Sequence, residues 1–356
     1  MTCDEALMRR CFELASKGRG HVSPNPLVGC VITAPNGRIV SEGYHQQYGQ
    51  NHAERNALLR QPGGTASYEG CSLYVNLEPC SHYGKTPPCA DLIIEKKIKR
   101  VVISTPDPNP LVAGQGLAKL RAAGIEVAQN ILFSEGRHLN RRFFTFMEKK
   151  RPYVILKWAE TADGFMDIDR NANPSGSYWI TNATLKTLSH RWRTSEDAIM
   201  VGANTVANDN PQLTARLWGG RSPLRITIDR TGRLPKDSHL FDGSLPTMVF
   251  TENKTLQIRQ NLTFVSVDFS NLLPAVLKYL HQNKVQSLIV EGGKQLIDSF
   301  LKANLWDEAR QLIGNVRFSN GLPAPKTGLM PDKTDIFADN TVNYYFNQCS
   351  RTLTEP

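Results

Sequence analysis

The stretch N-H-A-E-R-N-A-L-L (51–59), followed by L-E-P-C-S-H-Y-G-K-T-P-P-C-A-D (77–91), decides how the first half of the chain is interpreted. It supplies one imidazole, His52, and two thiols, Cys80 and Cys89. A histidine nitrogen and two thiolates are three ligands for a tetrahedral zinc ion, and they leave the fourth position for water. Zinc lowers the pKa of such a water toward about 7. The pattern therefore predicts a catalytic zinc site.

Glu54 stands two residues after His52 and is not needed as a ligand. Its position suits it to shuttle protons at the water on the metal. A purely structural zinc is disfavoured because no fourth cysteine or histidine has suitable spacing, and His82 would compete sterically with the turn at Cys80. H-x-E with a later P-C-x-x-C is the signature of zinc-dependent nucleobase deaminases, although here eight residues separate the two thiols.

The composition is that of a globular chain large enough for two domains. It has 356 residues, of which 40% are hydrophobic and 21% charged. No apolar run approaches the roughly 18 residues that a membrane span requires. Residues 1–18 lack the apolar core of a signal peptide. We therefore expect a cytoplasmic protein with no membrane partner.

The net charge of +9 admits either a nucleic-acid partner or anionic small molecules. Lysine and arginine are scattered apart from short runs at 95–100 and 148–151, which favours phosphorylated ligands. Seven cysteines without a secretory signal argue against disulfides, so the clustered pair Cys80 and Cys89 is better explained by metal binding or catalysis. Five of them lack ligand-like spacing and are interpreted as small apolar fillers: Cys3, Cys11, Cys30, Cys71 and Cys349.

Strands alternate with helices through both halves of the chain. Helices are predicted at 4–17 and 115–123, and strands at 72–77 and 100–104. Cys89 is expected to open a helix, where the helix dipole favours a thiolate. The alternation predicts an α/β sandwich with a largely parallel sheet. A basic run at 148–151 marks the boundary, so that the domains are predicted at 1–147 and 152–356.

In the second half, a buried strand at 287–291 leads into Gly292 and Gly293 and then a helix. Exposed backbone N–H groups and the helix dipole suit such a turn to phosphate binding, although an ordinary turn between a strand and a helix can have the same sequence. The absence of G-x-G-x-x-G argues against an ordinary dinucleotide-binding fold. Thr205 and Asp209 are equally compatible with turn formation, and Arg193 with a surface ion pair.

Five motifs of the first half occur together: P-N-P-L-V-G-C-V (24–31), G-Y-H (43–45), H-A-E (52–54), E-P-C-S-H-Y-G-K-T-P-P-C (78–89) and D-P-N-P (107–110). With them, this half resembles the pyrimidine deaminases of riboflavin biosynthesis, a branch of the cytidine-deaminase-like fold. The long spacer between the thiols is typical of that branch. The resemblance implies a three-layer α/β/α domain whose substrate is contacted by Asn25, His45, His82, Lys85, Asp107 and Asn109.

The chemistry of these side chains agrees with the resemblance. Lys85 and the histidines can meet a ribose phosphate, and Asn25 can hydrogen-bond a pyrimidine edge.

The second half carries K-W-A-E-T-A-D-G (157–164), S-Y-W-I-T (177–181), G-A-N-T-V (202–206), D-N-P-Q-L-T-A-R (209–216) and V-E-G-G (290–293). It resembles the reductase half of the same bifunctional family, which is similar in fold to dihydrofolate reductase. The resemblance assigns to NADPH the residues Trp179, Thr205, Asp209, Gly292 and Gly293. It assigns to the substrate the residues Lys157, Ser177, Arg193, Leu213, Arg216 and Glu291.

Two features depart from the family's pattern. Trp158 and Glu160 stand where smaller residues are common, and residues 310–325 stand where the closing strands are expected.

The resemblance implies deamination of 2,5-diamino-6-(5-phosphoribosylamino)pyrimidin-4-one in the first domain, followed by NADPH-dependent reduction of the ribosyl group in the second. A phosphorylated pyrimidine is then the partner, with no nucleic acid, and a homo-oligomer is expected. One alternative is a deaminase of RNA or another nucleobase, which would need a continuous basic groove with aromatic side chains. Another is a second domain that only binds a ligand or oligomerises.

Overall fold

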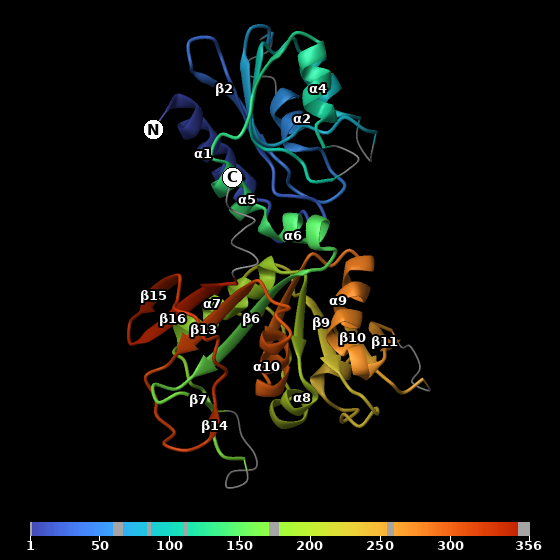
Figure 1. Cartoon of the computed structure of the whole chain (residues 1–356), viewed down its shortest axis with the longest axis vertical. Helices are drawn as coiled ribbons and strands as arrows, with labels where there is room; N and C mark the ends of the chain where they lie inside the picture. The colour runs from blue at the N-terminus through green and yellow to red at the C-terminus, as the bar shows by residue number, and fades with distance from the viewer. Residues whose placement is uncertain are drawn as a thin grey trace. The chain divides into compact units, whose positions relative to one another are not determined.

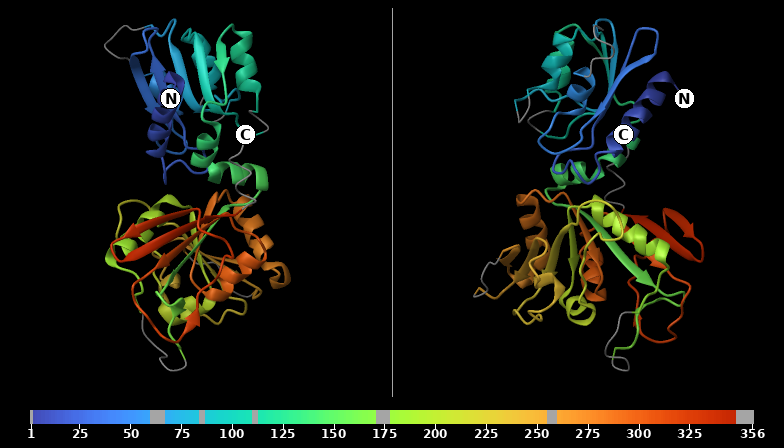
Figure 2. Two further views of the ribbon diagram at one scale, coloured as in Figure 1. Left: turned by 60° about the vertical axis from the view of Figure 1, so that its left-hand side comes forward. Right: turned by 180° about the vertical axis from the view of Figure 1, so that it is seen from behind.

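The computed structural model describes residues 2–59, 67–83, 87–109, 113–170, 178–254 and 260–347. The chain divides into two compact units between Lys149 and Lys150. Each unit has its own sheet, and helices lie on both faces of each sheet (Figures 1 and 2). No helix within the described ranges is long and apolar enough to cross a membrane.

The first unit contains a five-stranded sheet in the order β2-β1-β3-β4-β5. Strands β3, β4 and β5 are parallel, whereas β1 pairs antiparallel with both β2 and β3. The prediction of a largely parallel sheet is confirmed for β3, β4 and β5, whereas the turn at Gly37 (φ 82°) reverses the chain between β1 and β2 and makes this edge antiparallel. The strands are β1 (Gly29–Thr33), β2 (Ile39–Tyr44), β3 (Ser72–Leu77), β4 (Arg100–Thr105) and β5 (Glu126–Ala128).

Helices cover both faces of this sheet. On one face, Val31, Tyr74 and Val102 pack with helix α1. On the other, Cys30 and Leu73 belong to the core that also holds side chains of α2, α3 and α4. The alternation of neighbouring strand residues between the two clusters is what a pleated strand buried on both sides requires. The helices are α1 (Cys3–Ser16), α2 (Ala53–Leu58), α3 (Cys89–Glu95), α4 (Gln115–Ala122), α5 (Phe133–Leu139) and α6 (Arg141–Lys149).

Close backbone contact places α2, and with it the zinc-site histidine. A Cβ on Gly43 of β2 would lie 2.5 Å from the carbonyl oxygen of Ala53. Only glycine permits this approach, which seats the first turn of α2 directly against the sheet.

The second unit contains a nine-stranded sheet in the order β11-β10-β9-β8-β12-β6-β13-β16-β15. The strands from β11 to β13 are parallel, and β16 and β15 close the edge in antiparallel fashion. The strands are β6 (Tyr153–Glu160), β8 (Ala198–Val201), β9 (Leu224–Ile228), β10 (Thr247–Thr251), β11 (Leu262–Ser266), β12 (Ser287–Glu291), β13 (Glu308–Ile313), β15 (Lys333–Phe337) and β16 (Asn340–Phe346).

Both features of the sequence that depart from the family's pattern contribute to strands of this sheet. Residues 308–313 form β13, which pairs with β6 and with β16, so closing strands are present. Trp158 is buried, and its indole Nε1–H donates to Glu160 Oε2 at 2.8 Å. The two unusual residues of β6 therefore satisfy each other.

Helices α9 and α10 pack on one face of the second sheet, in the core that includes Leu156 and Val290. Helices α7 and α8 contribute Trp192 and Val206 to a core on the other face. Besides α7 (Ala183–Ser195), α8 (Ala203–Asp209), α9 (Leu272–Gln282) and α10 (Lys294–Lys302), the unit has short 3-10 helices at His239–Phe241 and Phe269–Asn271 and a two-stranded sheet of β7 (Phe165–Asp167) and β14 (Leu322–Pro323).

Candidate functional site

Three predicted zinc ligands come from three separate elements of the first unit. His52 is the N-cap of α2, Cys80 follows β3, and Cys89 is the first residue of α3. Pro88 provides the N-cap of α3 without a backbone donor, as suits the start of a helix. The ligands converge because α2 and α3 contact each other, and the N-terminus of each helix lies beside the turn that follows the carboxyl end of β3.

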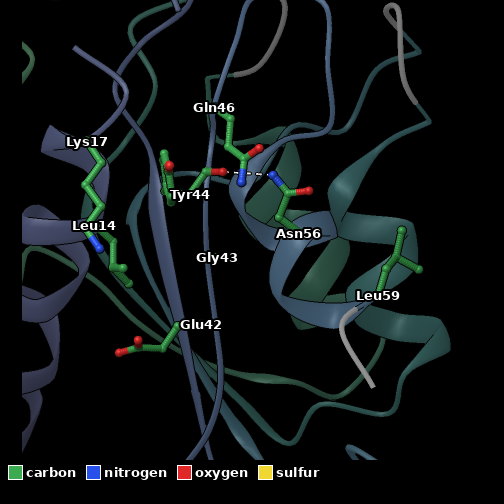
Figure 3. A pocket seen from close by; sticks show the side chains of 8 residues that line it. All are labelled: Leu14, Lys17, Glu42, Gly43, Tyr44, Gln46, Asn56 and Leu59. Carbon is green, nitrogen blue, oxygen red and sulfur yellow. Dashed lines mark hydrogen bonds between the residues drawn. The ribbon is translucent and has the colours of Figure 1, made fainter. Parts of the chain in front are cut away.

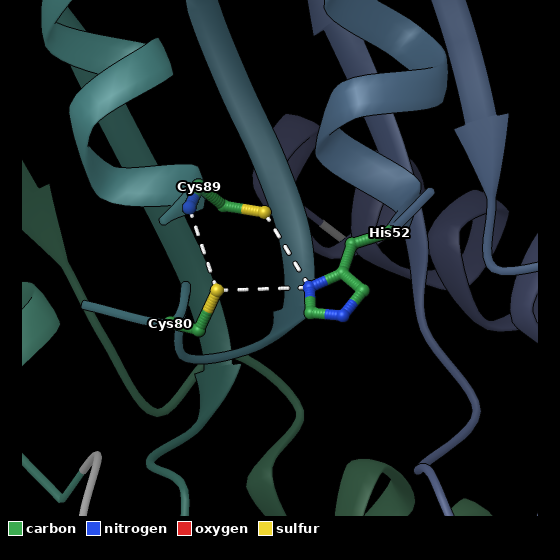
Figure 4. Close-up of side chains that lie close together, drawn as sticks. All are labelled: His52, Cys80 and Cys89. Atoms are coloured by element: carbon green, nitrogen blue, oxygen red, sulfur yellow. Dashed lines mark hydrogen bonds between the residues drawn. The ribbon is translucent and has the colours of Figure 1, made fainter. Parts of the chain in front are cut away.

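The separations of the ligand atoms fit a zinc ion. Both Sγ atoms, of Cys80 and Cys89, lie 3.6 Å from Nδ1 of His52 (Figure 4). All three donor atoms lie within 4.8 Å of one another. Tetrahedral bonds of about 2.3 Å to sulfur and about 2.0–2.1 Å to nitrogen would place sulfur and nitrogen about 3.6 Å apart. The donor set, two thiolates and an imidazole, is one that zinc prefers.

Local hydrogen bonds prepare the Cys80 thiol as a ligand. The backbone N–H of Cys89 donates to Sγ of Cys80 at 3.4 Å, and the N–H of Ala90 donates to the Cys80 carbonyl at 3.1 Å. Hydrogen bonding with Cys89, aided by the neighbouring His52, lowers the pKa of the Cys80 thiol to about 4. The fold thus stabilises a thiolate at Cys80.

Glu54 lies within the first turn of α2 and is 3% exposed. Burial raises the pKa of its carboxyl to about 7, although His52 acts in the opposite direction, and its side chain hydrogen-bonds with Cys89. A carboxyl with a pKa near neutrality can both accept and release a proton. Glu54 therefore has the environment of a general acid–base group beside the ligands.

The buried His45 and the partly buried Asn25 form a pair beside the zinc ligands. His45 Nδ1 lies 3.0 Å from the carbonyl oxygen of Asn51, which can only accept, so that Nδ1 carries the proton. Nε2 is then an acceptor, and it receives the Asn25 amide at 3.0 Å. Burial lowers the pKa of the His45 imidazole, in keeping with a neutral ring. The ring also meets His52 edge-on, with centroids 5.4 Å apart.

Two buried amides hold the segment that carries Asn25, and no sequence motif indicates either of them. Asn140 accepts from Leu27 N at 2.8 Å and donates to Leu27 O at 2.9 Å. Asn76, from β3, donates to the same carbonyl and accepts from Gly29 N at 2.7 Å. Neither residue belongs to a recognisable motif, so only their burial in the fold reveals them.

Asp107 and Asn109 follow β4, the neighbour of β3 in the sheet. The Asp107 carboxylate accepts from Asn109 N at 2.8 Å, and burial raises the pKa of this carboxyl to about 7. His82 is exposed just after Cys80. Lys85 lies outside the described residues.

The predicted substrate residues of the second unit include a triad of charged groups. Lys157 of β6 and Glu291 of β12 are register partners, and Lys157 Nζ donates to Glu291 Oε1 at 2.7 Å. Arg193 of α7 donates to Glu291 Oε2 through Nε and Nη2, at 3.1 and 2.9 Å. Burial alone would raise the pKa of the Glu291 carboxyl, but Arg193 and Lys157 outweigh it and lower the pKa to about 2.

The loop after α8 adds further groups to this region. Arg193 Nη1 donates to the Thr214 carbonyl at 2.9 Å, and Arg216, which is exposed, donates to the Thr214 hydroxyl at 3.1 Å. Leu213 is buried in the left-handed backbone region with φ 54°. His190 of α7, which no sequence motif indicates, is 3% exposed, and its pKa is lowered to about 4 by burial and by Arg193. Ser177 lies outside the described residues.

Three residues assigned to the cofactor lie together. Gly292 and Gly293 have φ of 89° and 77°, and Gly293 is the N-cap of α10. A Cβ on Gly293 would lie 3.2 Å from Oγ1 of Thr205. Backbone N–H groups at such a turn, with a hydroxyl beside them, are suited to phosphate oxygens.

The other two cofactor candidates are at the surface. Trp179 is 62% exposed, and Nζ of Lys186 lies 3.8 Å from its ring centroid. Asp209 pairs with Arg170 at 3.2 Å.

A cavity of about 340 Å³ in the first unit holds none of the predicted site residues. In it, the Asn56 amide donates to the Tyr44 carbonyl at 2.8 Å (Figure 3). Its lining is Leu14, Lys17, Glu42, Gly43, Tyr44, Gln46, Asn56 and Leu59.

Two family models match the chain. Residues 1–105 match the cytidine and deoxycytidylate deaminase zinc-binding region, and residues 152–317 match the RibD C-terminal domain. With the three converging zinc ligands, the fold and site define a zinc-dependent deaminase of the cytidine deaminase class joined to a reductase with a dihydrofolate-reductase-like fold.

Relatives match both units together. The riboflavin biosynthesis protein RibD of Bacillus amyloliquefaciens is 42% identical over 315 residues, covering 86% of this chain and 82% of that one. The RibD of Aquifex aeolicus is 39% identical over 332 residues, covering 92% and 91%. The chain belongs to the RibD family and is a bifunctional deaminase and reductase of riboflavin biosynthesis, with a zinc site in its deaminase domain and NADPH as the implied reductant.

A solved structure agrees with this assignment. The diaminohydroxyphosphoribosylaminopyrimidine deaminase/5-amino-6-(5-phosphoribosylamino)uracil reductase of Thermotoga maritima is 38% identical, with a TM-score of 0.87 over 96% of this chain and 98% of that one.

Proposed function

We propose that residues 1–147 hydrolyse the amino group of 2,5-diamino-6-(5-phosphoribosylamino)pyrimidin-4-one, and that residues 152–356 then reduce the ribosyl group of the aminouracil product. The observation that carries the proposal is the convergence of His52, Cys80 and Cys89 beside a buried Glu54. The substrates named for the Thermotoga maritima relative are the same pair of compounds.

In the deamination, a water oxygen bonds to the ring carbon that carries the amino group, the carbon–nitrogen bond breaks, and ammonia leaves. His52, Cys80 and Cys89 would hold zinc, which supplies acidity for the attacking water. Glu54 takes a proton from that water on its carboxylate and returns one to the departing nitrogen. Its raised pKa of about 7 suits it to both transfers.

Asn25 and His45 are proposed to orient the pyrimidine. Since the Asn25 amide N–H donates to Nε2 of His45, the Asn25 side chain is fixed in one orientation and its Oδ1 is left to accept from a base edge. Asp107 and Asn109 contact the substrate from the neighbouring turn. His82 and Lys85 follow Cys80 and would meet the ribose phosphate.

In the reduction, C1′ of the ribose gains a hydride, the electron pair of the C1′–O4′ bond moves to O4′, and O4′ takes a proton. NADPH supplies the hydride. Lys157 is the proposed proton donor to O4′, held in place by Glu291 at 2.7 Å. Arg193 and Arg216 attract the phosphorylated substrate, and Ser177 and Leu213 are assigned to its pocket.

For the cofactor, Thr205 with the Gly292–Gly293 turn is proposed to receive phosphate oxygens. Trp179 and Asp209 complete the proposed contacts. Trp179 has a broad exposed ring that can stack on a ring of the cofactor. A cytoplasmic location and a homo-oligomer remain predictions from the sequence.

A coupled assay on the diaminopyrimidine phosphate tests the proposal. Purified protein should release ammonia without NADPH, and should oxidise NADPH only after ammonia release has begun. Fluorescence titration with NADPH should show saturable binding. Absence of ammonia release would refute the deaminase substrate, and absence of saturable NADPH binding would refute the cofactor assignment.

A further inference from the structure

The carboxylate of Glu78 connects the turn that carries Cys80 with the segment from Asp107 to the start of α4. Glu78 lies two residues before Cys80 and is 3% exposed. Its Oε1 accepts from the backbone N–H groups of Gly116 and Leu117, at 3.1 and 3.4 Å. Its Oε2 accepts from those of Asp107 and Gly114, at 3.3 and 3.1 Å. One buried side chain thus binds four backbone donors.

These four bonds fill the acceptor positions of the carboxylate. An ionised carboxylate offers about four lone-pair sites, so Glu78 has none left for a metal ion or for proton transfer. Two of the bonds end at the first turn of α4, where the helix dipole favours a negative charge. Glu78 is therefore suited to hold structure in place rather than to take part in the reaction.

Close packing shows that α4 is seated on the same turn. A Cβ on Gly116 would lie 2.1 Å from the carbonyl oxygen of Pro79, the residue between Glu78 and Cys80. Any larger residue at this position must push α4 away from the turn.

The bonds to Oε2 hold the turn that carries two candidate substrate contacts. Glu78 binds Asp107 directly, and Asp107 in turn binds Asn109 N at 2.8 Å. The zinc-ligand side has separate supports, since the Cys80 carbonyl and Sγ accept from Ala90 N and Cys89 N. Loss of the Glu78 carboxylate should therefore displace the substrate turn more than the ligands.

We propose that Glu78 is a positioning residue of the deaminase, whose carboxylate fixes Asp107 and Asn109 where they bind the pyrimidine substrate. The inference rests on the proposed substrate role of Asp107 and Asn109. Glu78 would set the position of both residues relative to the zinc ligands.

The test is Glu78→Gln in the full chain, assayed by ammonia release from the diaminopyrimidine phosphate. The amide keeps the shape but replaces one acceptor oxygen with an N–H donor, which faces two backbone N–H groups. We expect KM to rise about ten-fold or more, with kcat changed less and zinc content unchanged. Reduction of the aminouracil substrate, measured on the same sample, should be unaffected. The matched control is Glu69→Gln, whose side chain is 66% exposed in the same unit.

Gly116→Ala is a second route to the same displacement and should also raise KM with zinc retained. A role in overall folding alone would lower zinc content and the active fraction but leave the KM of the remaining enzyme unchanged. Lower zinc content with an unchanged KM in both variants would overturn the proposal. An unchanged KM in Glu78→Gln with zinc content unchanged would also overturn it.

Asn109→Ala separates failure of the inference from failure of the proposed contacts. If KM rises in Asn109→Ala but not in Glu78→Gln, the contacts stand and the role of Glu78 is wrong. If KM is normal in Asn109→Ala, the substrate contact and the inference built on it both fall. We expect both single variants to raise KM, and the double variant to raise it by less than the product of the two increases.

Discussion

The two sites differ in how their charged groups are balanced. In the deaminase unit, two thiols, an imidazole and a buried carboxyl lie together, and within the part of the chain that the structure describes no lysine or arginine forms an ion pair with Glu54. In the reductase unit, Lys157 and Arg193 neutralise Glu291 at 2.7 and 2.9 Å. The first site thus depends on a cation for its charge balance, whereas the second carries its own.

The positions of the two sites in their folds are nevertheless alike. His52 and Cys89 start helices in the first unit, and Glu291 ends a strand that leads through Gly293 into α10 in the second. Both sites lie at the carboxyl ends of strands, where helices begin. This is the usual binding side of α/β proteins. The chemistry therefore follows from the side chains placed there, and the two reactions should be separable.

The largest expected effect is the loss of deamination when zinc is removed. Treatment with a chelator should abolish ammonia release, because the thiolates and imidazole alone cannot acidify water. Reduction of the aminouracil phosphate should continue, since the described residues of the second unit contain no comparable metal-ligand cluster. Zinc analysis alongside both assays checks the prediction. Equal loss of both activities would show that the sites are not independent.

Glu54→Gln should lower kcat for ammonia release on the order of 10³-fold, because it removes the proton-transfer group and leaves the ligands. Zinc content should stay at the wild-type level. Glu69→Gln again serves as the control. Near-normal turnover in Glu54→Gln would refute the acid–base role.

Lys157→Gln should reduce kcat/KM for the reductase about 10²-fold, since it removes the proposed proton donor. Ammonia release should not change. Lys333→Gln, with a side chain 64% exposed in the same unit, is the matched control. If NADPH oxidation by Lys157→Gln equals that of the control, Lys157 has no part in the reduction.

Acid stability should show the smallest effect. Because the pKa of Glu291 falls from 4.5 to about 2 on folding, its contribution to stability is complete above pH 4.5 and is lost as the pH falls toward 2. This loss amounts to about 3 kcal/mol in the free energy of unfolding. Urea denaturation between pH 5 and 2 should give a shallower decline for Glu291→Gln than for wild type. Parallel declines would mean that the pKa of Glu291 is not depressed.

Sequence alone was sufficient for the zinc ligands, because their residue types and their spacing along the chain already identify them. The strands at 72–77 and 287–291 were also predicted with their observed ends. The antiparallel pairing of β1 with β3 was missed, because periodicity does not give strand direction. Asn76, Asn140 and Glu78 were missed since their importance lies in backbone groups that only the fold brings near them.

Some of the candidate site depended on the resemblance. Nothing in its surroundings along the chain distinguishes Arg193 from a surface arginine, and the ion pair with Glu291 spans 98 positions. Sequence spacing cannot report contacts of that range. The orientation of Asn25 by His45 likewise needed the hydrogen bonds of both ring nitrogens.

One time course tests the central claim, that two separable sites act in the order deamination and then reduction. Glu54→Gln is mixed with the diaminopyrimidine phosphate and NADPH, and ammonia and NADPH are followed together. We predict neither ammonia release nor NADPH oxidation until the aminouracil phosphate is added, and then reduction at the wild-type rate. Oxidation of NADPH before that addition, with no ammonia released, would contradict the account.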